Sequence, residues 1–402
     1  MMKKHLVMIC GLHHPQPSAT ATCAERYVSL FKDEYDIDII SHTQDGKPNE
    51  LTDDSGYRLH VLTNKRLRLE GSLRGVAKRL MHKLGSALLY TSYLGNQRWF
   101  ANAISHKLEK IHQQHPIDVV FSVCSPLAAH VGAAKFCASH PDICSVAYTV
   151  DPYATSDRIK PLGKSFNDLM NYECYWLNQF QSVLLSEEVF ENRKDLTEQI
   201  KHPIPLPYLL PPFLDYSTTR KKTLHKAINC VYAGSFYEDI RNPEYMLKVF
   251  LLLESKNIVL HLYSKGCEDI TYQFKNAKNI VLHGLVKPTD LKQVYADADA
   301  LIGIGNSMKE FLPSKTFEYV ATRKPIIYFN YPNIDNPILK NYPIAIQLDM
   351  SEQLNIAADT LKDFLSHLKG DLVPETEILS AYKKYSSFNI KKILKNSFVP
   401  TK

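Results

Sequence analysis

The chain has 402 residues, and a length above the usual limit of a single core predicts two domains of roughly 200 residues each. Its hydrophobic content of 45% and its net charge of +6 are typical of a soluble globular protein. The eight cysteines contain no CxxC pair and mostly fall in apolar runs, which favours reduced thiols, a cytosolic protein and no metal site. The apolar run of six residues before Gly11 is too short for a signal peptide or a membrane-spanning helix.

Alternating strands and helices are predicted along the first half of the chain. Apolar runs typical of strands covered on both faces of a parallel sheet occur at residues 5–10, 36–42, 57–62, 117–124 and 144–150. Helical patterns follow, one beginning near Thr20, one running from Trp99 to His112, and one after Cys124. This rhythm predicts a doubly wound α/β domain, in which ligands bind at the carboxyl ends of the strands.

A basic segment interrupts this rhythm. Between Lys65 and Lys83 there are seven Lys and Arg residues but only one acid, Glu70, with apolar residues in between. A basic face beside an apolar one suits an anionic membrane surface, so we expect peripheral contact with a membrane. A solvated helix face or a basic loop explains the same residues. Nucleic acid is not an expected partner, because the segment lacks stacking aromatic residues.

The region after residue 200 is predicted to join the two domains. A helix near 164–178 precedes a strand that ends at Ser186, and this serine is expected to cap the next helix. The proline-rich segment 204–217 and the charged segment 218–227 offer little to a core and indicate a linker. We therefore predict a first domain at residues 1–215, a second at 216–375 and a C-terminal segment at 376–402.

The second domain is predicted to open with a strand, a glycine-containing turn and a helix at residues 228–253. Gly234 stands where the backbone can approach an anion, and Arg241 can bind a phosphate through paired donors. Further strands are expected at 258–264 and 279–286, followed by a helix and the strand ALIGIG. The second half therefore repeats the α/β pattern of the first.

The stretch from Asn306 to Phe329 gives the strongest indication of a site. A polar turn is followed by a helix that Ser314 can cap, and the run PIIYF is typical of a buried strand. The first amides of a helix have no partners within it and carry partial positive charge. Residues near Ser314 and Lys315 can therefore receive the phosphates of a nucleotide, and Lys315 adds a full charge.

Two carboxylates frame this turn. Pro313 favours a loop position for Glu310 and a position one helical turn inside for Glu318. A carboxylate in either place can accept hydrogen bonds from sugar or ribose hydroxyls. The alternative for these residues is an amphipathic surface helix with solvated Glu and Lys side chains.

The same stretch resembles the donor site of retaining glycosyltransferases of family 4. The paired glutamates of that family match Glu310 and Glu318, and its PSK…FEY…A…KP pattern is matched by Pro313, Ser314, Lys315, Phe317, Glu318, Tyr319, Ala321, Lys324 and Pro325. The resemblance implies an α/β GT-B fold, in which two Rossmann-like, doubly wound domains face a central cleft and a C-terminal helix crosses back to the first domain. It also implies sugar transfer with retention and without a bound metal.

The resemblance implies roles for residues elsewhere. Asp151 matches a strand end at which the family places a residue that touches the donor sugar, although an Asp-Pro turn is the structural alternative. Gly284 and Leu285 match the strand end at which backbone groups meet the nucleobase, and a turn that needs glycine is equally compatible. Arg241 fits a bacterial variant pattern, GxFYxxxRxP, with Ser235 where the family usually has Arg.

The first loop departs from the family pattern. Ser18, Ala19 and Thr20 stand where glycines are usual in this acceptor-side loop. Side chains at these positions obstruct close approach of the backbone to a phosphate. The loop is therefore expected to contribute to the acceptor side rather than to grip the diphosphate.

Together these features predict a cytoplasmic glycosyltransferase, peripheral on the inner face of the membrane, that moves a hexose from a UDP-sugar to a lipid-linked saccharide in cell-surface glycan biosynthesis. Glu310 is expected to hold the sugar and Glu318 the ribose, while Arg241 and Lys315 stabilise the leaving diphosphate. No cofactor is expected, since the nucleotide sugar is a substrate. Two alternatives stay open: a nucleotide-sugar epimerase or hydrolase of the same fold, and a catalytically silent binding partner.

Overall fold

The computed structural model describes most of the chain. The described residues are 3–14, 19–43, 50–52, 56–63, 93–94, 97–124, 126–155, 164–215, 227–253, 257–287, 290–307, 315–368, 370 and 372–399. Several predicted features lie outside these ranges, namely Ser18, Glu310, Ser314, most of the charged segment 218–227 and the basic segment from Lys65 to Lys83. Ala19 and Thr20 lie in a helix, but their side chains are also outside what the structure describes.

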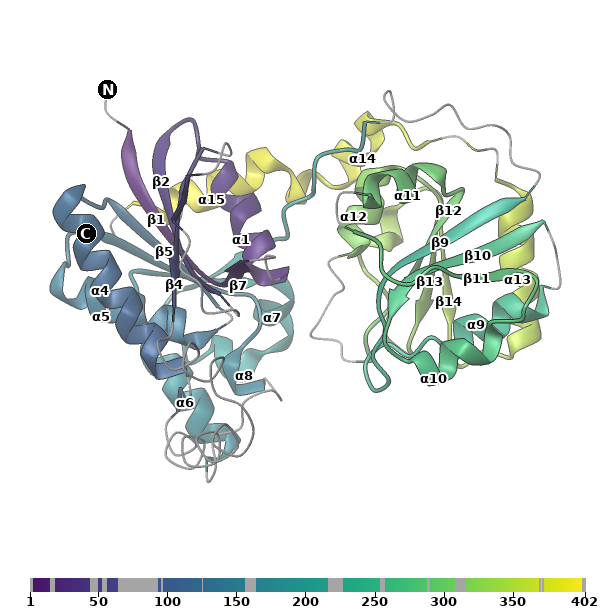
Figure 1. Ribbon diagram of the computed structural model, residues 1–402, viewed down its shortest axis with the longest axis horizontal. Helices are drawn as coiled ribbons and strands as arrows, with labels where there is room; N and C mark the ends of the chain where they lie inside the picture. Colours follow the sequence, from purple (N-terminus) through teal and green to yellow (C-terminus); the bar gives the residue numbers. More distant parts are fainter. Residues whose placement is uncertain are drawn as a thin grey trace, which may run out of the picture. The chain divides into compact units, whose positions relative to one another are not determined.

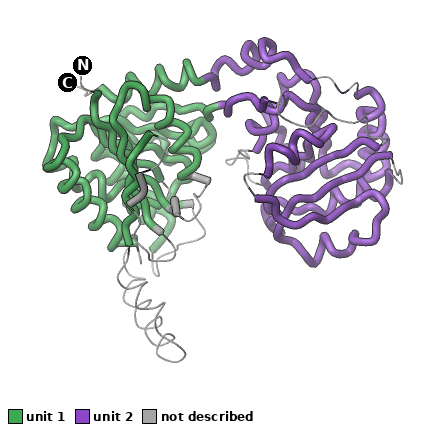
Figure 2. The backbone as a smooth tube through the Cα atoms, turned by 45° about the horizontal axis from the view of Figure 1, so that its top comes forward, with its two compact units in different colours: residues 1–209, 387–402 green, residues 210–386 purple. Residues whose placement is uncertain are grey.

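The chain divides into two compact units (Figure 2). Unit 1 comprises residues 1–209 and 387–402, and unit 2 comprises residues 210–386. The sequence predicts boundaries at 215/216 and 375/376, which lie 6 and 11 residues away from the divisions at 209/210 and 386/387. Residues 210–215 belong to unit 2 because Leu210 N donates to Tyr385 O at 2.9 Å and Leu214 N donates to Ala321 O at 3.2 Å.

Unit 1 is built on an eight-stranded sheet with the strand order β3-β4-β2-β1-β5-β6-β7-β8. All neighbouring strands are parallel except β3 and β4. The strands are β1 (Lys4–His14), β2 (Tyr35–Thr43), β3 (Glu50–Thr52), β4 (Arg58–Leu62), β5 (Val119–Cys124), β6 (Cys144–Thr149), β7 (Ser182–Ser186) and β8 (Pro203–Leu206). β5, β6 and β7 are buried along their whole length, as their continuous apolar runs predict.

Helices cover both faces of this sheet (Figure 1). α1 (Ala19–Ser29) and α15 (Ser387–Ser397) share one apolar core with the sheet. The opposite core is formed with α4 (Arg98–Gln114), α5 (Leu127–Ser139) and α6 (Phe166–Leu177). The short helices α7 (Glu187–Asn192) and α8 (Lys194–Thr197) follow β7. The last helix of the chain therefore completes the core of unit 1.

Unit 2 contains a parallel sheet with the strand order β11-β10-β9-β12-β13-β14. The strands are β9 (Ile228–Ser235), β10 (Ile258–Lys265), β11 (Ile280–Leu282), β12 (Ala300–Ile304), β13 (Ile326–Asn330) and β14 (Ala345–Asp349). α9 (Glu244–Leu252) and α13 (Leu354–Ser366) share the apolar core on one face. Figure 1 shows α11 (Leu291–Asp297) and α12 (Lys315–Thr322) on the other face. The sheet is therefore covered on two sides, like that of unit 1.

Three segments differ from the sequence-based expectation. β8 forms within the proline-rich stretch, and its place at the sheet edge tolerates prolines that cannot donate a hydrogen bond. β11 is much shorter than the run 279–286, because Gly284 turns the chain with a φ of +72°. The C-terminal segment forms two helices, α14 (Glu375–Ala381) in unit 2 and α15 in unit 1, with a 3₁₀ turn at Lys383–Tyr385 between them.

The cysteines behave as small apolar residues. All eight lie in the described part of the chain, where they are free thiols, and seven of them are buried while Cys267 is partly exposed. None of the helices in the described ranges combines the length and the apolar character that crossing a bilayer requires.

Candidate functional site

The carboxyl ends of the unit 2 strands surround a small cavity. Its lining residues are Tyr232, Ala233, Gly234, Arg241, Gly303, Ile304, Lys315, Thr316, Tyr319 and Tyr328. Three predicted site residues, Gly234, Arg241 and Lys315, therefore meet there, although Lys315 comes from a segment far along the chain from the other two. Two cations at the carboxyl ends of parallel strands occupy the place where sheets of this type bind ligands.

A tight turn and a side chain from the segment that follows β12 hold Arg241 in place. Arg241 N donates to Tyr237 O at 2.7 Å, and Tyr237 N donates back to Arg241 O at 3.2 Å. The guanidinium donates to Asn306 Oδ1 from Nη2 at 2.7 Å and from Nε at 3.2 Å. A longer bond of 3.5 Å joins Nη1 to Ser235 O, so the predicted Ser235 contributes its carbonyl here. The orientation of Arg241 is thus determined before any ligand arrives.

Lys315 is the first residue of α12. Its ammonium donates to Glu318 Oε2 at 2.8 Å and to the Tyr295 hydroxyl at 3.2 Å. Burial, assisted by Tyr319 and Glu318, raises the pKa of Tyr295 well above its usual value, so the hydroxyl stays neutral. The structure therefore brings two predicted donor-site residues, Lys315 and Glu318, into direct contact as an ion pair at the helix start.

Neutral tyrosines form the floor of the cavity. Burial raises the pKa of Tyr232, Tyr319 and Tyr328, so these phenols remain protonated. Tyr328 packs so closely that a Cβ at Gly303 would lie 2.3 Å from its ring, which only glycine avoids. The charge of the cavity therefore comes from its cations, which are balanced at the edge by Glu318.

The predicted glycines differ in why they are needed. Gly284 requires glycine because its φ is +72°, and it lies with Leu285, which is 61% exposed, after β11 and away from the cavity lining. A Cβ at Gly234 would meet only the Tyr232 side chain, at 3.4 Å, and Gly234 is not among the glycines with positive φ. Packing within the described residues thus does not demand glycine at position 234.

Asp151 lies in unit 1, two residues after the end of β6, and is exposed. Its carbonyl accepts a bond of 3.7 Å from Cys124 Sγ. Burial raises the pKa of Cys23 in α1 to about 12, and the charges of Asp151 and Glu188 contribute to a smaller extent. Both acids therefore lie near α1. The structure therefore places Asp151 at the carboxyl end of its own sheet, as predicted, while Arg241 and Lys315 belong to unit 2.

Sequence reasoning included Asn306 in the candidate stretch without giving it a role, and it missed Tyr295. Asn306 stands two residues beyond β12, and a polar residue at a strand end was a usable signal. Tyr295 carried no such signal, because an aromatic residue in an amphipathic helix usually belongs to the core. Another residue matched by the family pattern, Lys324, has a structural role here, since its buried ammonium donates to Ala296 O and Ala298 O at 2.6 Å each.

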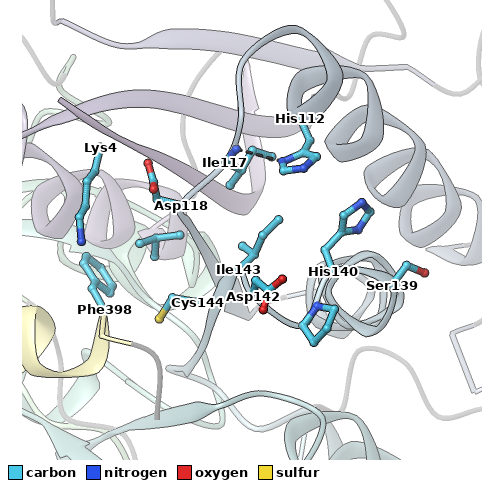
Figure 3. A pocket seen from close by; sticks show the side chains of 12 residues that line it. Lys4, His112, Ile117, Asp118, Ser139, His140, Asp142, Ile143, Cys144 and Phe398 are labelled. Carbon is cyan, nitrogen blue, oxygen red and sulfur yellow. Dashed lines mark hydrogen bonds between the residues drawn. The ribbon is translucent and has the colours of Figure 1, made fainter. Parts of the chain in front are cut away.

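A second cavity, of about 380 Å³, lies in unit 1 at the amino ends of β1, β5 and β6 (Figure 3). Lys4, Asp118, His112, His140 and Phe398 are among its lining residues, and none of the predicted site residues is. Parallel sheets bind ligands at the opposite, carboxyl edge, so we do not assign the donor site here. Within the described ranges, no group of three or more His, Cys, Asp and Glu side chains is placed to hold a metal ion.

No protein-family model and no curated protein sequence matches the chain. Among solved structures, sucrose-phosphate synthase from Thermosynechococcus elongatus is similar over 98% of both chains, with a TM-score of 0.64 and 10% identity. An E. coli protein described as trehalose-6-phosphate bound with UDP-2-fluoro glucose covers 99% of this chain and 100% of its own, with a TM-score of 0.60 and 11% identity. The lipopolysaccharide outer core galactosyltransferase WaaB covers 98% of both chains, with a TM-score of 0.53 and 10% identity.

These similarities extend over both units and concern the fold, since the identities are only 10–11%. They agree with the two parallel sheets and their helical layers. The fold class predicted from the sequence is thereby confirmed: the chain is an α/β protein with two Rossmann-like units of the GT-B type.

Proposed function

We propose that the protein is a retaining glycosyltransferase that moves a sugar from a nucleotide diphosphate sugar to a saccharide acceptor. The observation that carries the proposal is the convergence of Arg241 and Lys315 on one cavity at the start of α12. A diphosphate leaving group needs fixed positive charge where its negative charge develops. A guanidinium held by Asn306 and an ammonium held by Tyr295 supply that charge in a defined geometry.

The ion pair between Lys315 and Glu318 fits a donor-dependent exchange of partners. A phosphate oxygen can replace Glu318 as the partner of Lys315, which releases the carboxylate to accept hydrogen bonds from the ribose hydroxyls. Gly234 fits the same site. No contact within the described residues requires glycine at this position. We therefore attribute the glycine to the ligand, because the lack of a side chain leaves room for a phosphate beside the backbone.

In the proposed reaction the bond between the anomeric carbon and the diphosphate breaks, and its electron pair stays on the diphosphate oxygen. The acceptor oxygen bonds to the anomeric carbon from the face that the diphosphate vacates, and its proton passes to the departing oxygen. Arg241 and Lys315 stabilise the diphosphate, Glu310 holds the sugar, and Glu318 holds the ribose. We assign the acceptor side to Asp151 and to the loop containing Ser18, Ala19 and Thr20, and the nucleobase to Gly284 and Leu285.

The finer assignments rest on separate observations. A UDP-sugar is our choice because one structural neighbour is described as bound to UDP-2-fluoro glucose. A lipid-linked acceptor in cell-surface glycan synthesis, at the cytoplasmic side of an anionic membrane, follows from the basic segment between Lys65 and Lys83. The description of WaaB as a lipopolysaccharide galactosyltransferase is compatible with such a role. Family 4 membership, hexose transfer and metal independence belong to the same proposal.

A thermal-shift panel of UDP-, GDP-, ADP- and TDP-sugars tests the proposal. We expect one of them to raise the melting temperature of the full chain, since a ligand that binds only the folded state stabilises it. Arg241→Ala and Lys315→Ala should abolish the shift, whereas Lys362→Ala, an exposed lysine on α13, should retain it. No shift with any sugar nucleotide would contradict the proposal. Conversion of the donor without an acceptor would instead identify an epimerase or a hydrolase.

A further inference from the structure

A buried carboxyl group lies beneath the turn that follows Asp151. Glu173 in α6 is fully buried, and its two oxygens accept hydrogen bonds from successive backbone amides. Tyr153 N donates to Oε1 at 2.8 Å, and Ala154 N donates to Oε2 at 3.0 Å. These two bonds join α6 to the carboxyl end of β6 across about 20 residues of sequence.

The turn depends on this side chain for its first hydrogen bonds. The chain leaves β6 at Thr149, exposes Asp151, and enters a 3₁₀ turn at Tyr153–Thr155. The leading N–H groups of such a turn have no partner within it, and a buried N–H without a partner destabilises the fold. One carboxyl group supplies both acceptors, so Glu173 determines where the backbone after Asp151 lies.

A second contact ties the same turn to α6. The Tyr153 hydroxyl donates to Tyr93 O, and the Tyr93 ring stacks on Tyr172, one residue before Glu173, at a centroid distance of 4.2 Å. The turn, Tyr93 and α6 therefore form one packed cluster. Because the phenol of Tyr153 and the carboxyl of Glu173 act on the same three-residue turn, its position is held by two separate contacts.

We propose that Glu173 is a positioning residue that holds the Asp151 turn at the carboxyl end of the unit 1 sheet through the amides of Tyr153 and Ala154. The effect on Asp151 as a residue of the acceptor side rests on the proposed function. The holding of the turn does not rest on the proposed function, because it follows from the two hydrogen bonds to Glu173 alone.

The surroundings of Glu173 make this contact sensitive to pH. Burial raises the pKa of Glu173 to about 7 against the two backbone hydrogen bonds and the charge of Arg193, which lower it. The other titratable groups that act on this site from the described elements are Cys124, Cys174 and Tyr153, and burial raises the pKa of each, so all three are neutral near pH 7. Arg193 in turn forms two bonds, of 2.9 and 2.8 Å, with Asp195.

The sign of the pH effect follows from the raised pKa. The closed turn favours protonated Glu173, whereas opening the turn admits water and returns the carboxyl group toward its ordinary pKa near 4.5. Raising the pH through 7 therefore makes opening easier. With these two pKa values, the population of the open turn should rise about tenfold between pH 6 and pH 8.

Hydrogen exchange in the full chain tests the holding of the turn. We would label the full chain from pH 6 to pH 8, digest it, and measure deuterium uptake in the fragment that contains Tyr153 and Ala154. The uptake is corrected for the intrinsic exchange rate of each amide. Protection should fall about tenfold in the wild type and stay constant in Glu173→Gln, which cannot ionise. Glu191→Gln removes an exposed acid of α7 and should behave like the wild type. Wild-type protection that does not change with pH would overturn the proposal, whether or not Glu173→Gln folds.

Release of UDP from UDP-glucose, with a saccharide acceptor present, tests the consequence for Asp151. In Glu173→Gln the dependence of the release rate on pH near 7 should disappear, while the thermal shift produced by UDP-glucose stays the same because Glu173 lies in unit 1. Identical pH profiles in variant and wild type would overturn the positioning role. A wild type that shows no thermal shift with any sugar nucleotide contradicts the proposed function alone, and the exchange experiment still decides the role of Glu173.

Discussion

The two units share one architecture but carry opposite charges at corresponding places. In each, a sheet of mainly parallel strands is covered by helices on both faces and presents polar residues at the carboxyl ends of these strands. Unit 2 presents Arg241 and Lys315 there, each held by a neutral or acidic neighbour. Unit 1 presents Asp151, with a second acid, Glu173, buried beneath it. The fold therefore places polar groups at the same edge of both sheets, and a few side chains determine the charge that each edge presents.

Removal of Arg241 should have the largest effect. Arg241→Ala deletes a fixed donor to the proposed leaving group, and the loss of one such donor lowers kcat by about 10²–10³. Asp151→Asn in unit 1 should leave the donor-induced thermal shift intact, because the two charges act on different parts of the reaction. Steady-state kinetics and thermal shifts on both variants measure the contrast. Equal loss of donor binding in both variants would contradict the assignment of donor binding to unit 2 alone.

Glu173 should make the stability of the protein depend on pH. Its pKa is raised from 4.5 to about 7 in the folded chain, so its stabilising contribution is full below pH 4.5 and is lost as the pH rises through 7. Between pH 5 and pH 8 the free energy of unfolding of the wild type should fall by about 2 to 3 kcal/mol more than that of Glu173→Gln. Urea titrations at both pH values provide the measurement, and parallel curves for the two proteins would contradict this assignment.

A matched pair of glycine substitutions compares packing in the two units. A Cβ at Gly132 in α5 would lie 2.6 Å from Ala101 O, and a Cβ at Gly303 in β12 would lie 2.3 Å from the Tyr328 ring. Gly132→Ala and Gly303→Ala should each destabilise the protein by about 1 to 3 kcal/mol, since neither site has room for a methyl group. Only Gly303→Ala should also weaken donor binding, because Tyr328 lines the cavity. Denaturation curves and donor titrations separate these effects.

Loss of Asn306 should have the smallest effect of the series. Asn306→Ala removes the acceptor of two bonds from Arg241 but leaves the guanidinium present. Its remaining bond to Ser235 O is longer, so the cation should move more freely and donor affinity should fall about tenfold, which corresponds to loss of one charge-assisted hydrogen bond. Isothermal titration with the stabilising sugar nucleotide measures this. An affinity equal to that of the wild type would show that Arg241 needs no support.

Much of the fold could be predicted because its signals are local. The apolar run SVLLS forms β7. Ser186 caps α7, as predicted from the sequence, because its side chain accepts a hydrogen bond of 3.4 Å from Val189 N. β11 was predicted too long and the C-terminal segment as one helix, because composition marks strands and helices better than it marks their ends. The predicted cations Arg241 and Lys315 could be named because each follows a strand or begins a helix.

The sequence alone thus determined which segments become strands and helices, and which charged residues follow them, since the pattern that predicts each element lies within a few neighbouring residues. The tertiary structure decided the partners. Asn306 meets Arg241 across 65 residues, Tyr295 meets Lys315 across 20, and Glu173 meets the amide of Tyr153 across 20. Such contacts depend on the order of the strands and on how helices pack against them, and no local pattern in the chain records either.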